Sequence, residues 1–253
     1  MCLVVFAYRV HPDYELILLA NRDEFHARPT QGLQRWDADF FAGRDRHAGG
    51  SWLGLHHDGR FAALTNVREG PPRLSPRSRG ELISGFLSEV DWAVPSPSTA
   101  ARDYSGFNLL LGQWQDDDWR LRFVSNRYAE QALTPGVYAL SNGELNSDWP
   151  KVRKARQALT SLLDGDTVPS LQWLDALTDR AGADDADLPD TGIGLVKERW
   201  LSPCFIVSDG YGTVSSNLVL VASEQLYVGE RRYDQHGEIA GATEFRWSRH
   251  RQR

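Results

Sequence analysis

Apolar residues along this 253-residue chain fall into short runs that predict a protein built mainly from strands. These runs are rich in Val, Leu, Ile, Tyr and Phe, which suit the half-buried surface of a pleated sheet. They lie at residues 3–8, 14–20, 107–112, 119–125, 137–141, 204–208, 215–222 and 225–231. The segment "RVHPD" predicts a turn between the first two runs. In "SWLGLHHDGRFAALTN", Asp58-Gly59 predicts a hairpin that brings Trp52 and Asn66 to the same end.

Helix signals separate these strands. Ser78 followed by Glu81 forms a capping-box signature ahead of "LISGFLSEV" and predicts a helix over residues 79–90. "SDWPKVRKARQALTSLLDG" has a cap, an early proline and a closing glycine, the marks of another helix, and a further one is expected near 170–181. "VPSPSTA" and the acidic "AGADDADLPDTG" predict loops. This order predicts an α+β architecture of antiparallel sheets with helices packed on an outer face.

Composition limits the class of protein further. No break or linker divides the chain, so a single domain over residues 1–253 is expected. Hydrophobic residues at 41% and charged residues at 25% are typical of a soluble protein, and no apolar run is long enough to cross a bilayer. The net charge of -6 weighs against nucleic-acid binding, and the basic "RWSRHRQR" is interpreted as a solvated end. Oligomeric state is left open.

The start of the chain predicts a cytoplasmic location. Arg9, His11 and Asp13 interrupt the first apolar run, which a secretory signal would leave continuous. Two widely separated cysteines in such a chain are better interpreted as free thiols than as a disulfide. Cys204 opens a core-like run and is expected to be buried and inert.

Cys2 is the strongest candidate for chemistry. A small residue after the initiator permits removal of Met1, which would leave Cys2 with a free α-amine. A thiol with an ordinary pKa of about 8.5 and an amine of about 7.7 to 8.0 would then share one residue. The amine can act as the base for its own nucleophile. The alternative is a buried cysteine that opens a core strand, since free cysteine behaves as a small hydrophobe.

A polar cluster, "NRDE", follows the second apolar run. Asn21, Arg22, Asp23 and Glu24 come where a strand ends, and alternate residues there face opposite sides. If Cys2 and Asp23 lie on neighbouring strands, the carboxylate can hold the α-amine, while Arg22 can favour the thiolate or bind an anionic ligand. A strand-end cluster of salt bridges is the alternative interpretation.

Several motifs resemble one known family. "MCLVVFAYR", "LANRDEFHARPT", "GGSWLGLHHDGRFAALTNVRE", "RSRGELI", "GFNLLLG" and "LTPGVYALSNGELNSDWPKVRKAR" are similar to the NRDE family, also called the Transport and Golgi organisation 2 family. That family looks like a branch of the N-terminal nucleophile (Ntn) hydrolases. The resemblance implies a four-layer αββα sandwich with two mainly antiparallel sheets and the nucleophile at the start of the first strand.

The resemblance also implies roles for particular residues. In the cysteine branch, which includes penicillin V acylase and bile salt hydrolase, an aspartate near the end of the second strand assists the amine, and Asp23 is similarly placed. Asn66 and Asn142 resemble two asparagines that flank the reacting carbonyl. The implied catalytic residues are Cys2, Asp23, Asn66 and Asn142, and the predicted substrate-binding residues are Asn21, Arg22, Glu24 and Trp52. The sequence departs from the acylases at Ala20 and from the pattern of the family it resembles at Val214, where arginines are usual.

Two classes of function stay open. One is an amidase or acyl hydrolase that acts on C–N bonds other than peptide bonds through Cys2 and requires no cofactor. The other is a non-catalytic carrier on the same fold, for which the family's suggested links to haem trafficking and to acyl-CoA or lipid homeostasis make haem a candidate ligand. A purely structural role ranks last because it leaves the site residues unexplained. His56 and His57 beside Asp58 would point to opposite faces, so no metal site is predicted.

Overall fold

Strands outnumber helices in the computed structural model, which describes residues 2–70, 75–89, 91–95 and 97–249. The strands are β1 (Cys2–His11), β2 (Tyr14–Phe25), β3 (Thr30–Arg35), β4 (Phe40–Asp45), β5 (Leu53–His56), β6 (Phe61–Asn66), β7 (Phe107–Gln115), β8 (Asp118–Ser125), β9 (Gln131–Ala132), β10 (Gly136–Leu140), β11 (Val207–Ser208), β12 (Tyr211–Val221), β13 (Gln225–Tyr233) and β14 (Ile239–Ser248). The helices are α1 (Gly80–Ser88), α2 (Pro97–Asp103), α3 (Pro150–Leu163) and α4 (Leu195–Trp200), with 3-10 turns η1 (Leu171–Leu177) and η2 (Asp185–Asp187).

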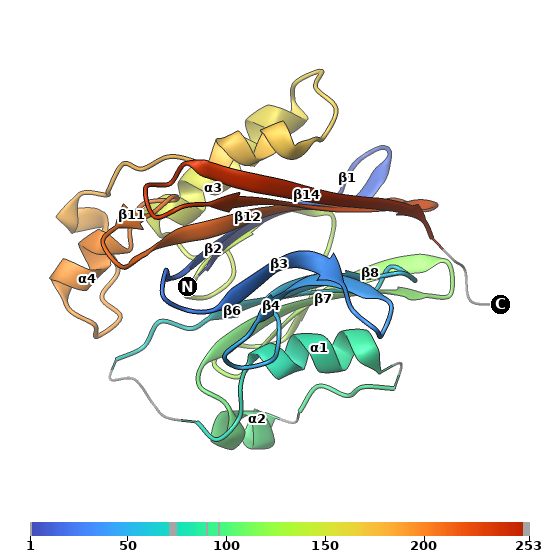
Figure 1. Ribbon diagram of the computed structural model, residues 1–253, viewed down its shortest axis with the longest axis horizontal. Coiled ribbons are helices and arrows are strands. Elements are labelled where there is room, and N and C mark those ends of the chain that lie inside the picture. Colours follow the sequence, from blue (N-terminus) through green and yellow to red (C-terminus); the bar gives the residue numbers. More distant parts are fainter. Residues whose placement is uncertain (1, 71–74, 90, 96, 250–253) are drawn as a thin grey trace.

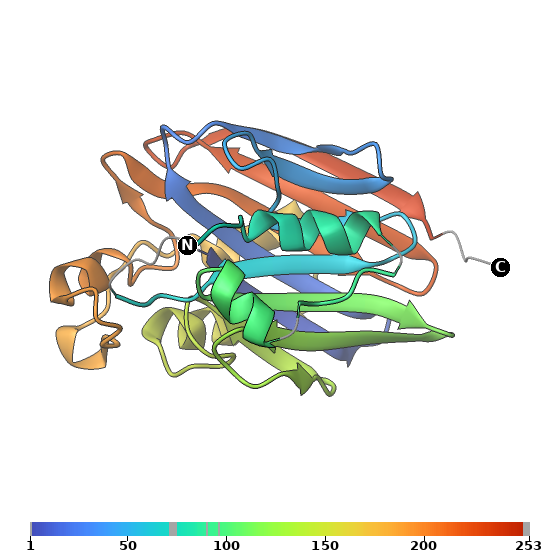
Figure 2. The same ribbon diagram turned by 90° about the horizontal axis from the view of Figure 1, so that it is seen from below.

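Two antiparallel sheets face one another. The first sheet has the order β10-β1-β2-β12-β13-β14, with β11 paired to β12, and the second has the order β3-β4-β5-β6-β7-β8-β9. Figure 1 shows α3 above the first sheet and α1 and α2 below the second, and Figure 2 shows α1 lying across the second sheet. The α+β class with two antiparallel sheets is therefore confirmed, and the layer order is the αββα order that the resemblance implied.

The alternation of side chains along β1 and β2 explains their continuous apolar runs. Val4, Phe6 and Tyr8 point into the core between the sheets, where they meet residues such as Leu53 and Leu110 of the second sheet. The intervening residues of both strands pack on the opposite face against α3 and η1. A strand buried on both faces has no polar face, so hydrophobic periodicity alone did not show which residues point toward which layer.

Several predicted elements need correction. The run at 204–208 forms a strand only at β11, and the helix expected near 170–181 is the shorter 3-10 turn η1. The helix predicted over 79–90 is α1, whose N-cap is Arg79 rather than Ser78, and Val90 lies outside the described residues. The loop predicted in "VPSPSTA" contains the start of α2. Strands β3, β4, β9 and β14 were not predicted.

The prediction for the basic end of the chain also needs correction. Residues 246–248 of "RWSRHRQR" belong to β14, which pairs with β13 along the edge of the first sheet. The ring of Trp247 packs on Phe41 of β4 at 4.4 Å between centroids. Arg249 lies over the Trp114 ring at 3.6 Å from its centroid. Cation–π contacts and an aromatic pair hold this segment on the protein, so it is not a free solvated end up to residue 249.

Candidate active site

Cys2 begins β1, between β10 and β2 in the first sheet. It pairs with Arg22 of β2, so these two side chains share one face of the sheet. That face is the one from which Val4 and Phe6 enter the core between the sheets. Cys2 therefore points toward the second sheet, at the end of the sandwich where the apolar core stops. Its side chain is partly buried and its thiol is free.

A cavity of about 240 Å³ lies in front of Cys2. Six of the residues predicted from the sequence line it, and they are Cys2, Arg22, Asp23, Glu24, Trp52 and Asn66. They come from both sheets, because β1 and β2 provide one wall and the segments around β5 and β6 provide the other. Two predicted residues, Asn21 and Asn142, do not line it.

Arg22 is only 5% exposed, and three neighbouring groups hold its guanidinium in place. Its guanidinium carbon lies 4.1 Å from the centroid of the Trp52 ring. Its Nη2 is 3.6 Å from Glu24 Oε2. Its Nη1 donates a hydrogen bond to Thr30 Oγ1 at 3.2 Å. Stacking and the carboxylate together compensate for burial of this charge.

The position of Trp52 depends on a glycine in the neighbouring strand β4. A Cβ atom at Gly43 would lie 2.2 Å from Trp52 Cη2, so no larger residue fits there without moving the indole. Because Arg22 stacks on that indole, Gly43 indirectly positions one wall of the cavity.

Asp23 borders the same cavity, but its carboxyl belongs to a buried charge network. Thr213 Oγ1 donates to Asp23 Oδ1 at 2.7 Å, and Asp23 is 1% exposed. Burial raises the pKa of the Asp23 carboxyl, while the nearby charges of Lys151 and Arg68 lower it. Lys151 is itself 3% exposed, and its Nζ donates to Leu201 O at 3.0 Å. Burial and Arg68 reduce the pKa of Lys151 to about 8, against the effect of Asp23.

A buried ion pair lies beside this network. Arg68 Nη1 donates to Glu198 Oε2, and both side chains are only 3% exposed. Glu198 also accepts a hydrogen bond from the Thr191 amide at 3.1 Å. The pair therefore fixes the acidic loop before α4 against the segment that follows β6.

The two asparagines take different positions. Asn66 lines the cavity, and no described residue forms a hydrogen bond to its side-chain amide. Asn142 is fully buried behind it, and its Nδ2 donates to the Asn66 backbone oxygen at 2.8 Å. Asn142 thus positions Asn66, and the amide best placed to meet a ligand is that of Asn66.

Asn21 and Cys204 are part of the structural framework. Asn21 Nδ2 donates to the carbonyl oxygens of Leu177 and Cys204, at 2.9 Å in both cases. Its Oδ1 accepts from Ser216 Oγ at 2.6 Å. This satisfied amide anchors η1 on the first sheet and leaves no polar atom for a substrate. Cys204 is 2% exposed, and burial raises the pKa of its thiol to about 11, as expected for an inert cysteine.

The surroundings of Cys2 raise the pKa of its thiol above the ordinary value. Burial is the main cause that raises its pKa, and the charge of Asp23 raises it further, while Arg22 lowers it. A thiol of this kind needs a nearby base before it can act as a nucleophile.

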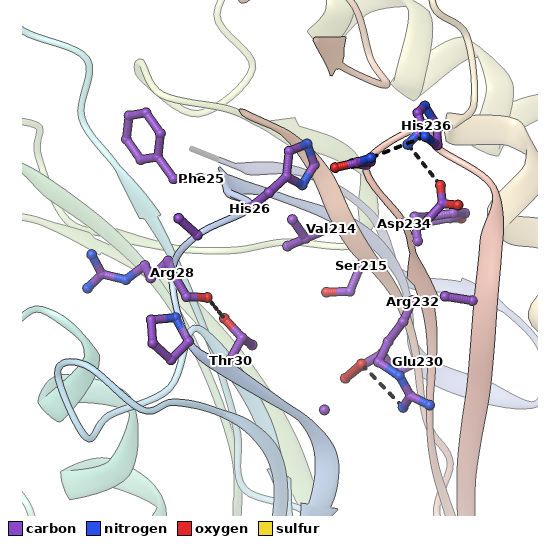
Figure 3. Close-up of a pocket in the computed structure, with 16 residues that line it drawn as sticks. Phe25, His26, Arg28, Thr30, Val214, Ser215, Glu230, Arg232, Asp234 and His236 are labelled. Carbon is purple, nitrogen blue, oxygen red and sulfur yellow. Dashed lines mark hydrogen bonds and ion pairs between the residues drawn. The ribbon is translucent and has the colours of Figure 1, made fainter. Parts of the chain in front are cut away.

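A larger cavity of about 770 Å³ adjoins the first (Figure 3). The two share Phe25 and Arg28. Val214 and Ser215 of β12 line the larger cavity, with Arg232 of β13 nearby. The Ser215 hydroxyl and His26 Nε2 are buried without a hydrogen-bond partner among the described residues, so this cavity offers unused polar groups to a ligand.

Sequence reasoning missed the residues that come from the helices. Lys151 lies four residues before Ala155 and eight before Leu159, and all three are on the buried face of α3. A charge on the apolar face of a helix was the available signal. Arg79, which also lines the smaller cavity, lies in the "RSRGELI" motif, but that motif did not assign it to the site.

The described residues contain no group of three or more His, Cys, Asp and Glu side chains placed to hold a metal ion. His56 lies with its Nδ1 2.8 Å from Asp58 Oδ1, while the ring of His57 stacks on Trp247. A search of the described residues finds no helix of sufficient length and apolar character to span a membrane.

The fold and cavity define a class of protein. It is an α+β sandwich of two antiparallel sheets whose first strand begins at a cysteine that faces a polar cavity. A profile of the Transport and Golgi organisation 2 family matches residues 1–235. The chain belongs to this family.

Relatives from animals support that assignment. The chain is 31% identical over 246 residues to the Transport and Golgi organization 2 homolog of Mus musculus, with 87% of this chain and 88% of the relative covered. It is 30% identical over 247 residues to the Homo sapiens homolog, with 88% of this chain and 90% of the relative covered.

Among solved structures, the Caenorhabditis elegans N-acylethanolamine-hydrolyzing acid amidase ortholog is similar with a TM-score of 0.43 and 9% identity, over 87% of this chain and 92% of that chain.

Proposed function

We propose that this protein is an amide or acyl hydrolase whose nucleophile is the Cys2 thiol. One observation carries the proposal, namely that Cys2 opens a central strand and faces a polar cavity of about 240 Å³. A cysteine with only a packing role contacts core side chains, as Cys204 does. The polar lining around Cys2, with Asn66 opposite it, instead suits a reacting carbonyl group.

In the proposed first step the base comes from the chain itself. Met1 is removed, and the α-amine of Cys2 accepts the thiol proton as Sγ bonds to the substrate carbonyl carbon. The carbonyl oxygen becomes negatively charged and accepts a hydrogen bond from the Asn66 side-chain amide. A preorganised donor of this kind stabilises the transition state by roughly 3 to 4 kcal/mol. Asp23 stabilises the α-ammonium, and the charge of Lys151 lowers the pKa of the Asp23 carboxyl against the effect of burial.

The remaining steps return the enzyme to its starting state. The tetrahedral intermediate collapses, its C–N bond breaks, and the leaving amine takes the proton from the α-ammonium. The acyl group stays on Sγ as a thioester. Water then adds to the thioester carbonyl while the α-amine accepts a proton from it. The C–S bond breaks, the carboxylic acid leaves, and the proton returns to Sγ.

Two measurements test this proposal. The intact mass of protein made in its native host reports whether Met1 is removed, and a retained Met1 contradicts the amine as base. The second is turnover of a panel of N-acyl aminomethylcoumarins. We expect Cys2→Ala to fold and lose all turnover, because alanine still permits removal of the initiator but has no nucleophile. Cys204→Ser is the matched control and should keep wild-type turnover.

A second candidate function is that of a carrier for haem or acyl-CoA. The adjoining cavity of about 770 Å³ favours it, because sites for small molecules and cofactors measure about 300 to 1,000 Å³. Titration with haem and with acyl-CoA, followed by absorbance and calorimetry, tests this candidate. If haem and acyl-CoA bind no more tightly than they bind an unrelated acidic protein, the carrier function is excluded. If either ligand binds both wild type and Cys2→Ala, and the wild type shows no hydrolase turnover, the carrier function is favoured over the hydrolase.

A further inference from the structure

Arg79 is brought to the Cys2 cavity by a close approach of two backbone segments. A Cβ atom at Gly50 would lie 2.4 Å from the carbonyl carbon of Gly80, so only glycine allows the start of α1 to pack here. The Ser51 amide donates to Gly80 O at 3.2 Å across the same contact. Arg79, directly before α1, is thereby held where it lines the cavity beside Cys2.

The guanidinium of Arg79 differs from those of the other two arginines that line the cavity. Arg22 lies 3.6 Å from a carboxylate oxygen of Glu24, and Arg28 lies 2.7 Å from one of Asp45. For Arg79, the hydrogen bond from Nη1 to the Gly106 carbonyl oxygen at 3.0 Å is the contact formed. No carboxylate oxygen in the described part of the chain lies within 4.0 Å of it.

The charge of Arg79 is electrostatically coupled to the Cys2 thiol. Burial lowers the pKa of its guanidinium, and the charge of a Cys2 thiolate would raise it. A partly buried cation without a counter-charge is costly, and a bound anion removes that cost. Of the carboxylates that line the cavity, Glu24 and Asp45 are engaged by Arg22 and Arg28, and Asp23 accepts a hydrogen bond from Thr213, so Arg79 is left available to a ligand.

We infer that Arg79 binds a carboxylate group of the substrate, so that this enzyme acts on small acyl compounds with a carboxylate close to the scissile bond. The inference rests on the proposed function, because it names the substrate class of the same site. With Nη1 on Gly106, the donors on Nε and Nη2 stay side by side. Such a pair suits two parallel hydrogen bonds to one carboxylate, and lysine cannot reproduce it.

The test uses two alkylating agents of nearly equal size that differ in charge. Iodoacetate carries a carboxylate and iodoacetamide is neutral, and the rate of Cys2 modification by each is followed by peptide mass spectrometry. We expect the iodoacetate-to-iodoacetamide ratio at Cys2 to exceed that of N-acetylcysteine by roughly tenfold, the size of one hydrogen-bonded charge contact. Arg79→Gln should reduce the ratio to the N-acetylcysteine value, and Arg79→Lys should keep only part of it.

Arg77→Gln is the matched control. Arg77 lies two residues earlier, is about half exposed, and is paired with Glu81 at 2.5 Å, so its loss should leave the ratio unchanged. An equal loss of the ratio in Arg77→Gln and Arg79→Gln would overturn the inference, as would a wild-type ratio equal to that of N-acetylcysteine.

If Arg79→Gln fails to fold, a measurement on the wild-type protein tests the role of Arg79 instead. Sodium glutarate should slow the modification of Cys2 by iodoacetamide, whereas neutral glutaramide should not. Equal protection by both compounds, or protection by inorganic phosphate with none by glutarate, overturns the carboxylate assignment. The ratio at Cys2 does not depend on turnover. An inactive wild type with a high ratio therefore contradicts only the proposed function, and an active wild type with no preference contradicts only this inference.

Discussion

Replacement of Lys151 by methionine tests the buried charge network beneath the site. Methionine has a similar shape and no charge, so the substitution removes the hydrogen bond from Nζ to Leu201 O. Burial lowers the pKa of Lys151 from its ordinary value of 10.5 to about 8. The unfolded chain therefore binds a proton that the folded chain has released between these two values. Wild-type stability must rise with pH across that window relative to Lys151→Met.

The size of this effect follows from the pKa difference. Each pKa unit corresponds to 1.36 kcal/mol, so the shift amounts to about 3 kcal/mol over the whole window. Linkage places about 2 kcal/mol of that change between pH 7.5 and 9.5. Below pH 8 the lysine is charged in both states and its burial penalty is fully present. The difference between the two proteins, rather than either curve alone, removes the contribution of titrating groups that are not coupled to Lys151, such as Tyr227.

Urea denaturation at pH 7.5, 8.5 and 9.5, followed by the fluorescence of the nine tryptophans, measures the free energy of unfolding. Lys154→Met is the matched control, since Lys154 lies on the same helix but is exposed and paired with Asp179 at 2.8 Å. Its difference from wild type should not change with pH over this range. A pH-independent difference for Lys151→Met would refute the reasoning, because it would mean that Lys151 keeps its ordinary pKa in the folded protein.

Two further predictions concern the framework. Glu198→Gln leaves the buried Arg68 guanidinium without its carboxylate, and we expect a loss of about 3 kcal/mol or more in the free energy of unfolding by urea titration; a loss under 1 kcal/mol would show that water or another group compensates. Gly43→Ala places a Cβ against the Trp52 ring, and we expect a loss of about 1 to 3 kcal/mol with a changed tryptophan emission spectrum. An unchanged spectrum and stability would contradict the close packing described for that indole.

The site was predictable where its residues follow directly from a strand. Cys2 and Arg22 lie across from each other because β1 and β2 form a hairpin, and alternation along a strand then determines which side chains share a face. The same rule separates Asn21 from the cavity, since it is one residue out of phase with Arg22 and points to the helical layer. The sequence predicted Asn21 as a substrate-binding residue, and the strand register places its side chain outside the cavity.

The contributions of the second sheet and the helices were not predictable from local patterns. Strands β3 and β4 are short and carry glycine and polar residues, so their apolar periodicity is weak. Strand β14 has alternating exposed positions and basic residues, and its strand character comes from pairing with β13. Non-local pairing and packing decide such segments more than intrinsic propensity does.

The sequence by itself determined the class of fold, the family and the position of the nucleophile candidate, because hydrophobic runs, turn residues and motifs are local signals. Only the tertiary structure decided which charges meet at the site. The charge of Lys151 on α3 acts on the pKa of Asp23 on β2, and Arg79 reaches the cavity from the start of α1, across gaps of more than fifty residues in the sequence. Burial and the pairing of neighbours determine whether such a group is compensated or available to a ligand, and both depend on how the layers pack together.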